Sequence, residues 1–140
     1  AADGYLVEHR YNELVYGIPC IMKTGREWHY ECPVHEVIST KDAGPFAMLP
    51  SPPYVMVYPE GARSRNPNKY ADDAEILLKH VAQNPDDHRA TYYLAQSYFN
   101  AGNNAEARKW YKRRTEMTAC AKLVDPNSLR ISQQGAFIPL

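Results

Sequence analysis

The chain has 140 residues, with 16 basic and 16 acidic side chains and no formal net charge. Hydrophobic residues make up 44% and charged residues 23%, a composition typical of a globular domain rather than of a disordered segment. The neutral balance argues against a nucleic-acid binder, and the longest purely apolar stretch, Tyr54 to Tyr58, is too short to span a bilayer.

The N-terminal third has the composition of β-strands. Residues 13–30 are rich in β-branched and aromatic side chains, and they predict two strands around a turn at residues 23–26, where Gly25 can adopt a positive φ. Pro19 has no backbone N–H group, so part of the first strand is expected to form a sheet edge or a bulge.

The next segments continue this extended character. Residues 31–39 carry Val34, Val37 and Ile38 and predict another extended piece. Residues 44–59 hold many prolines and predict a loop, with Tyr54 to Tyr58 as a strand inside it. The first 60 residues are therefore expected to form a small β-rich unit.

Beyond residue 67 the apolar residues recur at helical spacing. Asn66 is a candidate N-cap before Pro67 for a helix over residues 70–83, and a tight turn at residues 102–104 separates two further helices. Residues 67–117 therefore predict three antiparallel helices. The side chains expected to be buried between them are Leu77, Leu78, Leu94, Tyr98, Ala107 and Tyr111.

Residues 88–117 resemble one tetratricopeptide repeat, in which small residues let two helices approach and aromatic residues fill the groove. The matching residues are Leu94, Ala95, Tyr98, Ala107 and Tyr111, with Pro85 at the preceding boundary. The alternative is a generic helical hairpin. The sequence thus predicts an α+β fold, with a β-rich unit over 1–60, tetratricopeptide-like helices over 61–117 and an irregular tail over 118–140.

Two neighbouring polar residues, His35 and Glu36, are candidates for acid–base chemistry or metal ligation. On a strand, however, adjacent side chains face opposite ways, so an ordinary polar pair at a strand end is the alternative. His29, Cys32 and His35 have the residue types of a zinc site, but their spacing is not a standard zinc spacing. We therefore predict no metal site in this chain.

A short basic loop at residues 61–65 contains Arg63 and Arg65. It precedes the start of a predicted helix, where arginine side chains and backbone N–H groups can hold phosphate. A solvated loop without a ligand is the alternative interpretation.

Four segments, taken in order, carry a resemblance to a known family. They are Trp28-His-Tyr-Glu-Cys-Pro-Val-His-Glu36, Gly61-Ala-Arg-Ser-Arg-Asn-Pro-Asn-Lys-Tyr70, Tyr93-Leu-Ala-Gln-Ser-Tyr98 and Trp110-Tyr-Lys-Arg-Arg114. Together they resemble the C-terminal part of a family-2 glycosyltransferase of GT-A type that carries a tetratricopeptide-like helical domain. The resemblance implies transfer of a sugar from a nucleotide sugar to an acceptor, with a divalent ion, Mg²⁺ or Mn²⁺, in a complete parent enzyme.

The same resemblance implies roles for particular residues. His35 would approach the diphosphate or its ion, and Glu36 would line the acceptor site, which makes these two the catalytic candidates. Trp28 and Tyr30 would bind substrate from the first of the four segments.

Arg63 and Arg65 join Trp28 and Tyr30 as substrate-binding candidates. This sequence departs from the family because it contains no Asp-x-Asp motif and no nucleotide-sugar half, and Cys32 stands where the family tends to have Gly. We therefore expect the chain to be inactive alone and to hold no cofactor by itself, as a fragment or a relative of such a transferase.

The alternative function is a tetratricopeptide-like protein-interaction module or a structural subunit of a larger assembly, with a protein partner on the helical groove. The sparse, odd set of three cysteines is not a disulfide framework and is typical of a reducing compartment. A cytoplasmic protein is the corresponding expectation.

Overall fold

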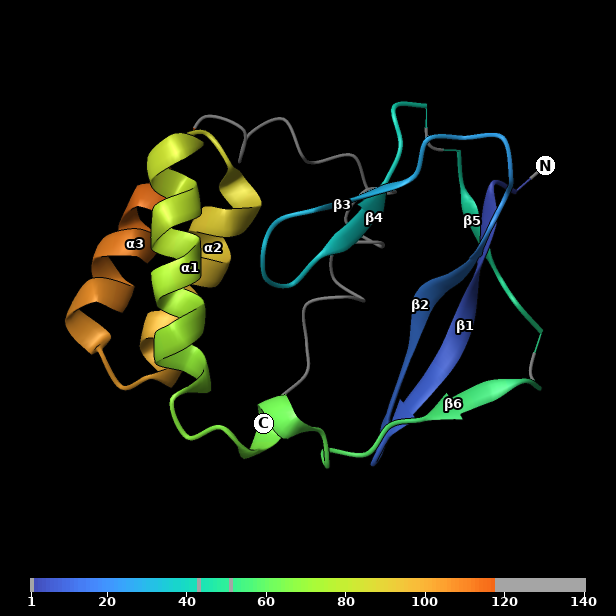
Figure 1. The fold of residues 1–140 in the computed structure, drawn as a ribbon, viewed down its shortest axis with the longest axis horizontal. Helices are drawn as coiled ribbons and strands as arrows, with labels where there is room; N and C mark the ends of the chain where they lie inside the picture. Colours follow the sequence, from blue (N-terminus) through green and yellow to red (C-terminus); the bar gives the residue numbers. More distant parts are fainter. Residues whose placement is uncertain (1, 43, 51, 118–140) are drawn as a thin grey trace. The chain divides into compact units, whose positions relative to one another are not determined.

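The computed structural model describes residues 2–42, 44–50 and 52–117. The irregular tail predicted over 118–140 lies outside these residues. The described chain divides into two compact units, which we call unit 1 (residues 2–30 and 38–59) and unit 2 (residues 31–37 and 60–117). In this part of the chain, six strands precede three packed helices, which confirms the predicted α+β class (Figure 1).

The sheet of unit 1 is built around β1 (Gly4–Tyr11). One edge of β1 pairs antiparallel with β2 (Leu14–Met22). Its other edge pairs in parallel with β5 (Phe46–Met48) and, further along, with β6 (Tyr54–Met56). Residues from the proline-rich segment therefore complete the sheet in two short pieces, and the strand expected within residues 54–58 is confirmed.

The two strands predicted around residues 23–26 are confirmed as β2 and a strand over His29–Glu31, but the two do not pair with each other. β2 pairs with β1 through a turn at Asn12, which has a φ of 50°. Asparagine tolerates this left-handed conformation better than most residues. Gly25 has the expected positive φ, 81°, but its turn does not join two paired strands.

The bulge expected at Pro19 is confirmed. Leu6 of β1 lies opposite Pro19 and Tyr5 lies opposite Ile21, so Cys20 is the extra residue on β2. β2 is also at the edge of the described sheet. Both features fit a proline that cannot donate to a sheet ladder.

A buried carboxylate joins the N-terminal segment of unit 1 to two of its loops. Asp3 is 4% exposed, and it accepts hydrogen bonds from the Arg26 guanidinium at 2.8 Å and from the Gly44 N–H at 2.5 Å. Burial alone would raise the pKa of Asp3, but these donors hold that pKa below its usual value. A Cβ atom on residue 44 would lie 2.3 Å from Asp3 Oδ2, so only glycine allows this approach.

β3 (His29–Glu31) pairs with β4 (Val37–Ser39). Between them the chain turns sharply, with a φ of 71° at Cys32 and of 56° at His35. The single extended piece expected over residues 31–39 is therefore wrong, since the middle of this segment is a turn. Pro33, which has no N–H to donate to a ladder, lies in that turn.

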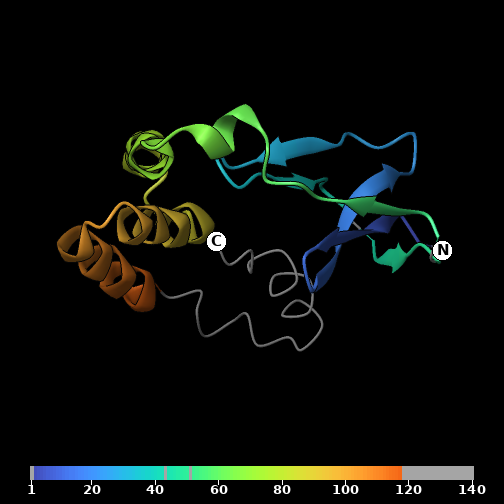
Figure 2. The ribbon, with the colours of Figure 1, turned by 90° about the horizontal axis from the view of Figure 1, so that it is seen from below.

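The three helices of unit 2 are α1 (Lys69–Gln83), α2 (His88–Asn100) and α3 (Asn104–Glu116). α1 packs on α2 and α2 packs on α3, as the side view in Figure 2 also shows. The prediction of three helices is confirmed. No helix within the described ranges is long and apolar enough to cross a membrane.

α2 and α3 begin with a side-chain N-cap, whereas α1 does not. Asp87 caps α2 by accepting a hydrogen bond from the Ala90 N–H at 2.8 Å. The predicted cap of α1 is wrong, because α1 begins after Asn68 rather than after Asn66. Asn66 instead accepts from the Asn68 N–H at 2.9 Å, in the loop that follows the short 3₁₀ helix η1 (Ala62–Arg65).

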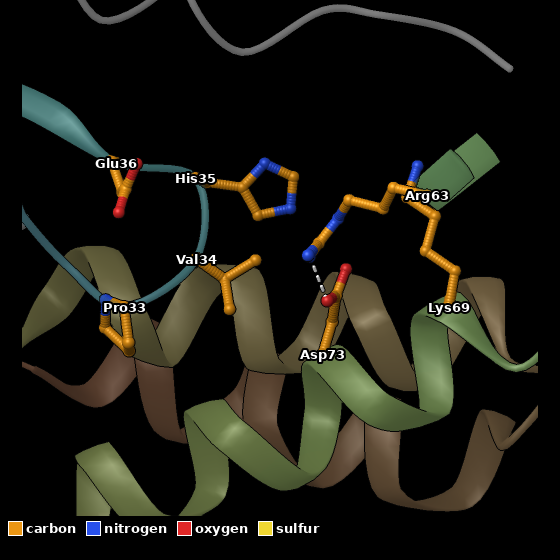
Figure 3. Close-up of a pocket in the computed structure, with 7 residues that line it drawn as sticks. All are labelled: Pro33, Val34, His35, Glu36, Arg63, Lys69 and Asp73. Atoms are coloured by element: carbon orange, nitrogen blue, oxygen red, sulfur yellow. Dashed lines mark hydrogen bonds and ion pairs between the residues drawn. The ribbon is translucent and has the colours of Figure 1, made fainter. Parts of the chain in front are cut away.

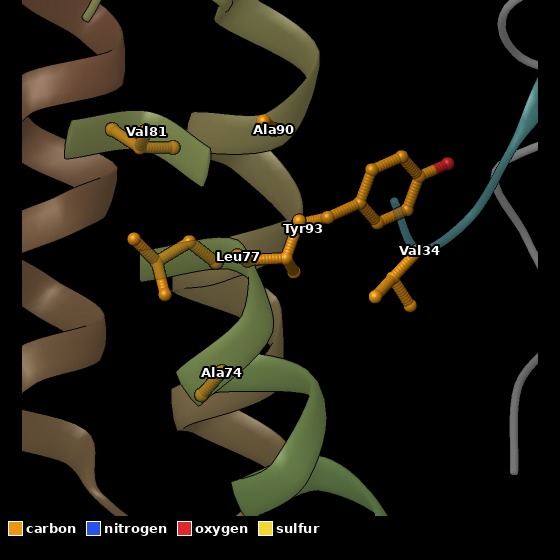
Figure 4. Close-up of a cluster of buried hydrophobic side chains, with 7 residues drawn as sticks. Val34, Ala74, Leu77, Val81, Ala90 and Tyr93 are labelled. Carbon is orange, nitrogen blue, oxygen red and sulfur yellow. The ribbon is translucent and has the colours of Figure 1, made fainter. Parts of the chain in front are cut away.

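The core of unit 2 lies between α1, α2 and the turn that carries Val34 (Figure 4). Of the side chains expected to be buried, Leu77, Leu94 and Ala107 are at most 2% exposed, which confirms them. Leu78 is 39% exposed, so that prediction is wrong. The buried stripe of α1 runs through residues 73, 74, 77 and 81, and a residue one position after Leu77 is rotated about 100° away from it.

Candidate functional site

A pocket of about 360 Å³ lies within unit 2, a volume in the usual range of small-molecule sites. The turn between β3 and β4, the helix η1 and the beginning of α1 contribute its walls (Figure 3). The lining residues are Pro33, Val34, His35, Glu36, Arg63, Lys69 and Asp73.

Two residues of α2 hold the turn in place. The Arg89 guanidinium donates to the His35 carbonyl oxygen at 2.8 and 3.2 Å. The His35 ring stacks on the Tyr93 ring, with centroids 4.1 Å apart and planes 10° apart. Because the chain turns here, the adjacent residues His35 and Glu36 line the same pocket, which a straight strand would not allow.

The environment of His35 favours the neutral imidazole. Part of the side chain is exposed, but packing against Tyr93 removes water from the ring, and this desolvation lowers the pKa of His35. The Asp73 carboxylate opposes the shift, whereas Arg89, Arg63 and Lys69 add to it. At neutral pH one ring nitrogen can therefore donate a hydrogen bond and the other can accept one.

This shift predicts an acid-sensitive stability. Because the folded-state pKa of His35 is below its ordinary value of 6.5, the unfolded chain binds more protons as the pH falls. The loss of unfolding free energy should begin near pH 6.5 and be complete below the folded-state pKa. Urea unfolding, followed by circular dichroism from about pH 7.5 to 5, measures this effect. The unfolding free energy of His35→Gln should fall less over this pH range than that of the wild type. Equal pH profiles would contradict this prediction.

Asp73 is the most buried charged group of the pocket. It is 2% exposed, and its Oδ1 pairs with the Arg63 guanidinium, whose side chain is 59% exposed. Its Oδ2 is also buried and has no hydrogen-bond partner among the described residues. The pocket thus combines two cationic side chains, Arg63 and Lys69, with a carboxylate that is only half satisfied.

The described residues do not fit a divalent metal ion. No three His, Cys, Asp or Glu side chains gather in a metal-binding arrangement within the described ranges, and this includes the His29, Cys32 and His35 set. Cys32 is a free thiol whose pKa burial raises, so it favours the protonated form. The pocket also carries two cationic groups, Arg63 and Lys69, which balance the carboxylates of Glu36 and Asp73.

The structure brings together some of the predicted site residues. His35, Glu36 and Arg63 line one pocket. Arg65 does not line it, and its guanidinium donates to the Glu60 carbonyl oxygen at 2.8 and 3.2 Å.

The two aromatic candidates belong to unit 1 and do not line this pocket. The Trp28 indole N–H donates to the Lys23 carbonyl oxygen at 2.9 Å, and its ring packs against Phe46. Tyr30 is 67% exposed.

Sequence reasoning missed Lys69 and Asp73. Asp73 precedes Leu77 by one helical turn, so it falls on the buried stripe of α1. A carboxylate on such a stripe is unusual unless it is paired, and this signal was available in the sequence. No comparable signal distinguishes Lys69.

No family model, curated protein or solved structure matches this chain. The likeness to family-2 glycosyltransferases therefore depends on the four sequence segments quoted above. The fold class and the geometry of the pocket are independent of that likeness.

Proposed function

We propose that this chain is the acceptor-side, helical end of a sugar-transferring enzyme, and that its pocket binds the phosphate groups of a nucleotide sugar. One observation supports this proposal above the others. His35 and Glu36, from the turn, line the same pocket as Arg63, from a segment far along the chain. These are three of the residues to which the resemblance assigns a role in binding or catalysis.

Two cationic side chains of the pocket, Arg63 and Lys69, are suited to a phosphate group. Arg63 uses one terminal nitrogen on Asp73, and its largely exposed side chain leaves other N–H donors available. Lys69 adds an ammonium group on the same side of the pocket (Figure 3). Arginine forms directional, charge-assisted hydrogen bonds to phosphate, and lysine acts as a point charge.

His35 and Glu36 supply the groups that sugar transfer requires. In the reaction, the acceptor oxygen forms a bond to the anomeric carbon, and the bond from that carbon to the diphosphate oxygen breaks. The electron pair leaves with the diphosphate, where the neutral His35 ring can donate a hydrogen bond. The exposed Glu36 carboxylate can take the acceptor's proton. A divalent ion, Mg²⁺ or Mn²⁺, belongs to the complete parent enzyme in this proposal.

Phosphate binding can be tested with inorganic pyrophosphate. We expect it to shift the NMR signals of residues 33–36 and of Lys69 in the labelled protein. Lys69→Gln should weaken binding about tenfold, because a charge-assisted contact contributes on the order of 1.5 kcal/mol. Arg63→Gln should weaken it at least as much.

Arg65→Gln is the matched control for Arg63→Gln, since both change an arginine of η1 and only Arg63 lines the pocket. Arg65→Gln should bind pyrophosphate within twofold of the wild type. Equal losses in the two arginine variants, or no shifts at the pocket, would contradict the proposal. Lys69→Gln leaves the Arg63–Asp73 pair intact, so it remains informative if Arg63→Gln is unstable.

A second function has its own supporting observation. The helices expose apolar side chains at Ile76, Leu78 and Phe99, which are 42%, 39% and 58% exposed. A protein-interaction module or an assembly subunit could use such residues to hold a partner. The two functions can be distinguished by the gene sequence upstream of residue 1, because a transferase requires an α/β nucleotide-sugar domain to be encoded there. The free thiols Cys20 and Cys32 are compatible with a cytoplasmic location in both cases.

A further inference from the structure

We propose that Asp73 is a specificity-determining residue, which accepts a hydrogen bond from a hydroxyl group of a sugar phosphate bound in the pocket. This inference rests on the proposed function, since the phosphate would lie on Arg63 and Lys69. The inference adds a second group that recognises the ligand: Asp73 binds the sugar, whereas Arg63 and Lys69 bind the phosphate.

The buried carboxylate has an unused acceptor. Asp73 is 2% exposed, Arg63 occupies its Oδ1, and its Oδ2 is buried without a partner among the described residues. In Figure 3, the Asp73 oxygen that has no dashed line points up from α1 toward the side of the pocket where Arg63 lies. A buried carboxylate oxygen without a hydrogen-bond donor is unfavourable. A hydrogen-bond donor on a ligand in the pocket would therefore stabilise this oxygen.

The surrounding charges decide which kind of donor fits. A ligand ammonium group at Oδ2 would lie beside the cationic Arg63 and Lys69 side chains, which repel it. A hydroxyl group carries no charge and donates one hydrogen bond. A ligand that offers both a phosphate for the two cations and a nearby hydroxyl for Oδ2 complements Arg63, Lys69 and Asp73 together.

Sugar phosphates have this combination, and in a nucleotide sugar the hydroxyl can come from the transferred sugar or from the ribose. The probes are the 1-phosphates of glucose, galactose, mannose and N-acetylglucosamine for the first source, and ribose 5-phosphate for the second. Methyl phosphate serves as the reference without a hydroxyl. Affinities are measured by NMR titration of the whole chain.

We expect at least one sugar phosphate to bind the wild type about tenfold more tightly than methyl phosphate, a factor expected for one hydrogen bond to a charged group. Asp73→Asn should reduce this preference to threefold or less while retaining affinity for methyl phosphate. Asp72→Asn is the matched control, because it removes the same charge from the neighbouring, exposed position of α1. It should keep the tenfold preference.

The inference is overturned if every sugar phosphate binds the wild type within threefold of methyl phosphate, which would mean that water satisfies Oδ2. It is also overturned if Asp73→Asn retains the full preference. The comparison of ligands on the wild type does not depend on the stability of any variant. If methyl phosphate and pyrophosphate both fail to bind, the proposed function fails as well, so the two failures are distinguishable.

Discussion

Shortening Leu77 to alanine is expected to lower the unfolding free energy of unit 2 by about 2–5 kcal/mol. Leu77 is fully buried between α1 and α2, so its loss removes apolar contacts and leaves a cavity that the helices can close only in part (Figure 4). The measurement is urea unfolding followed by the helical signal in circular dichroism.

Leu78→Ala is the matched control for this experiment. It makes the same chemical change one residue later in the same helix, at a side chain that is 39% exposed. The expected loss of unfolding free energy is below about 1 kcal/mol, because Leu78 is partly exposed and lies outside the buried core cluster, so its truncation leaves no enclosed cavity. Equal costs for Leu77→Ala and Leu78→Ala would show that the buried stripe of α1 is placed incorrectly.

Replacing His35 or Glu36 in a complete transferase is expected to reduce turnover by a factor on the order of 10² or more. The substitutions are His35→Ala and Glu36→Gln, made separately in an enzyme that includes the upstream nucleotide-sugar domain. Glu36 is exposed, so its variant should fold normally. The chain alone, assayed with nucleotide sugars and divalent ions, should show no turnover above solvent hydrolysis.

Stability must be measured beside turnover, because His35 also stacks on Tyr93. An exposed glutamate outside the pocket, Glu60, provides the matched control as Glu60→Gln and should keep normal turnover. Near-normal turnover in both pocket variants would leave His35 and Glu36 as an ordinary polar pair. Turnover by the chain alone would contradict its assignment as part of a larger active site.

The helical half of the molecule was predictable because its signals are local. Apolar residues at helical spacing identified the three helices, and a capping Asp87 and a left-handed Gly102 mark where α2 begins and where the turn after it lies. The β-rich half was predictable in composition but not in pairing. Strands of similar composition can pair in several ways, and β1 supplied a partner for β2 that the pattern over residues 13–30 did not include.

The candidate site shows the same division. Residue types alone suggested His35 and Glu36 for acid–base chemistry and Arg63 for phosphate binding, and it was the resemblance to family-2 glycosyltransferases that implied a common site for them. Only the tertiary structure shows that these three residues line one pocket together with Asp73. It also shows that Arg65 does not line that pocket and donates to the Glu60 carbonyl oxygen instead. Side-chain direction in a turn depends on backbone angles such as the φ of 56° at His35, and these are maintained by long-range contacts from Arg89 and Tyr93 that no local pattern encodes.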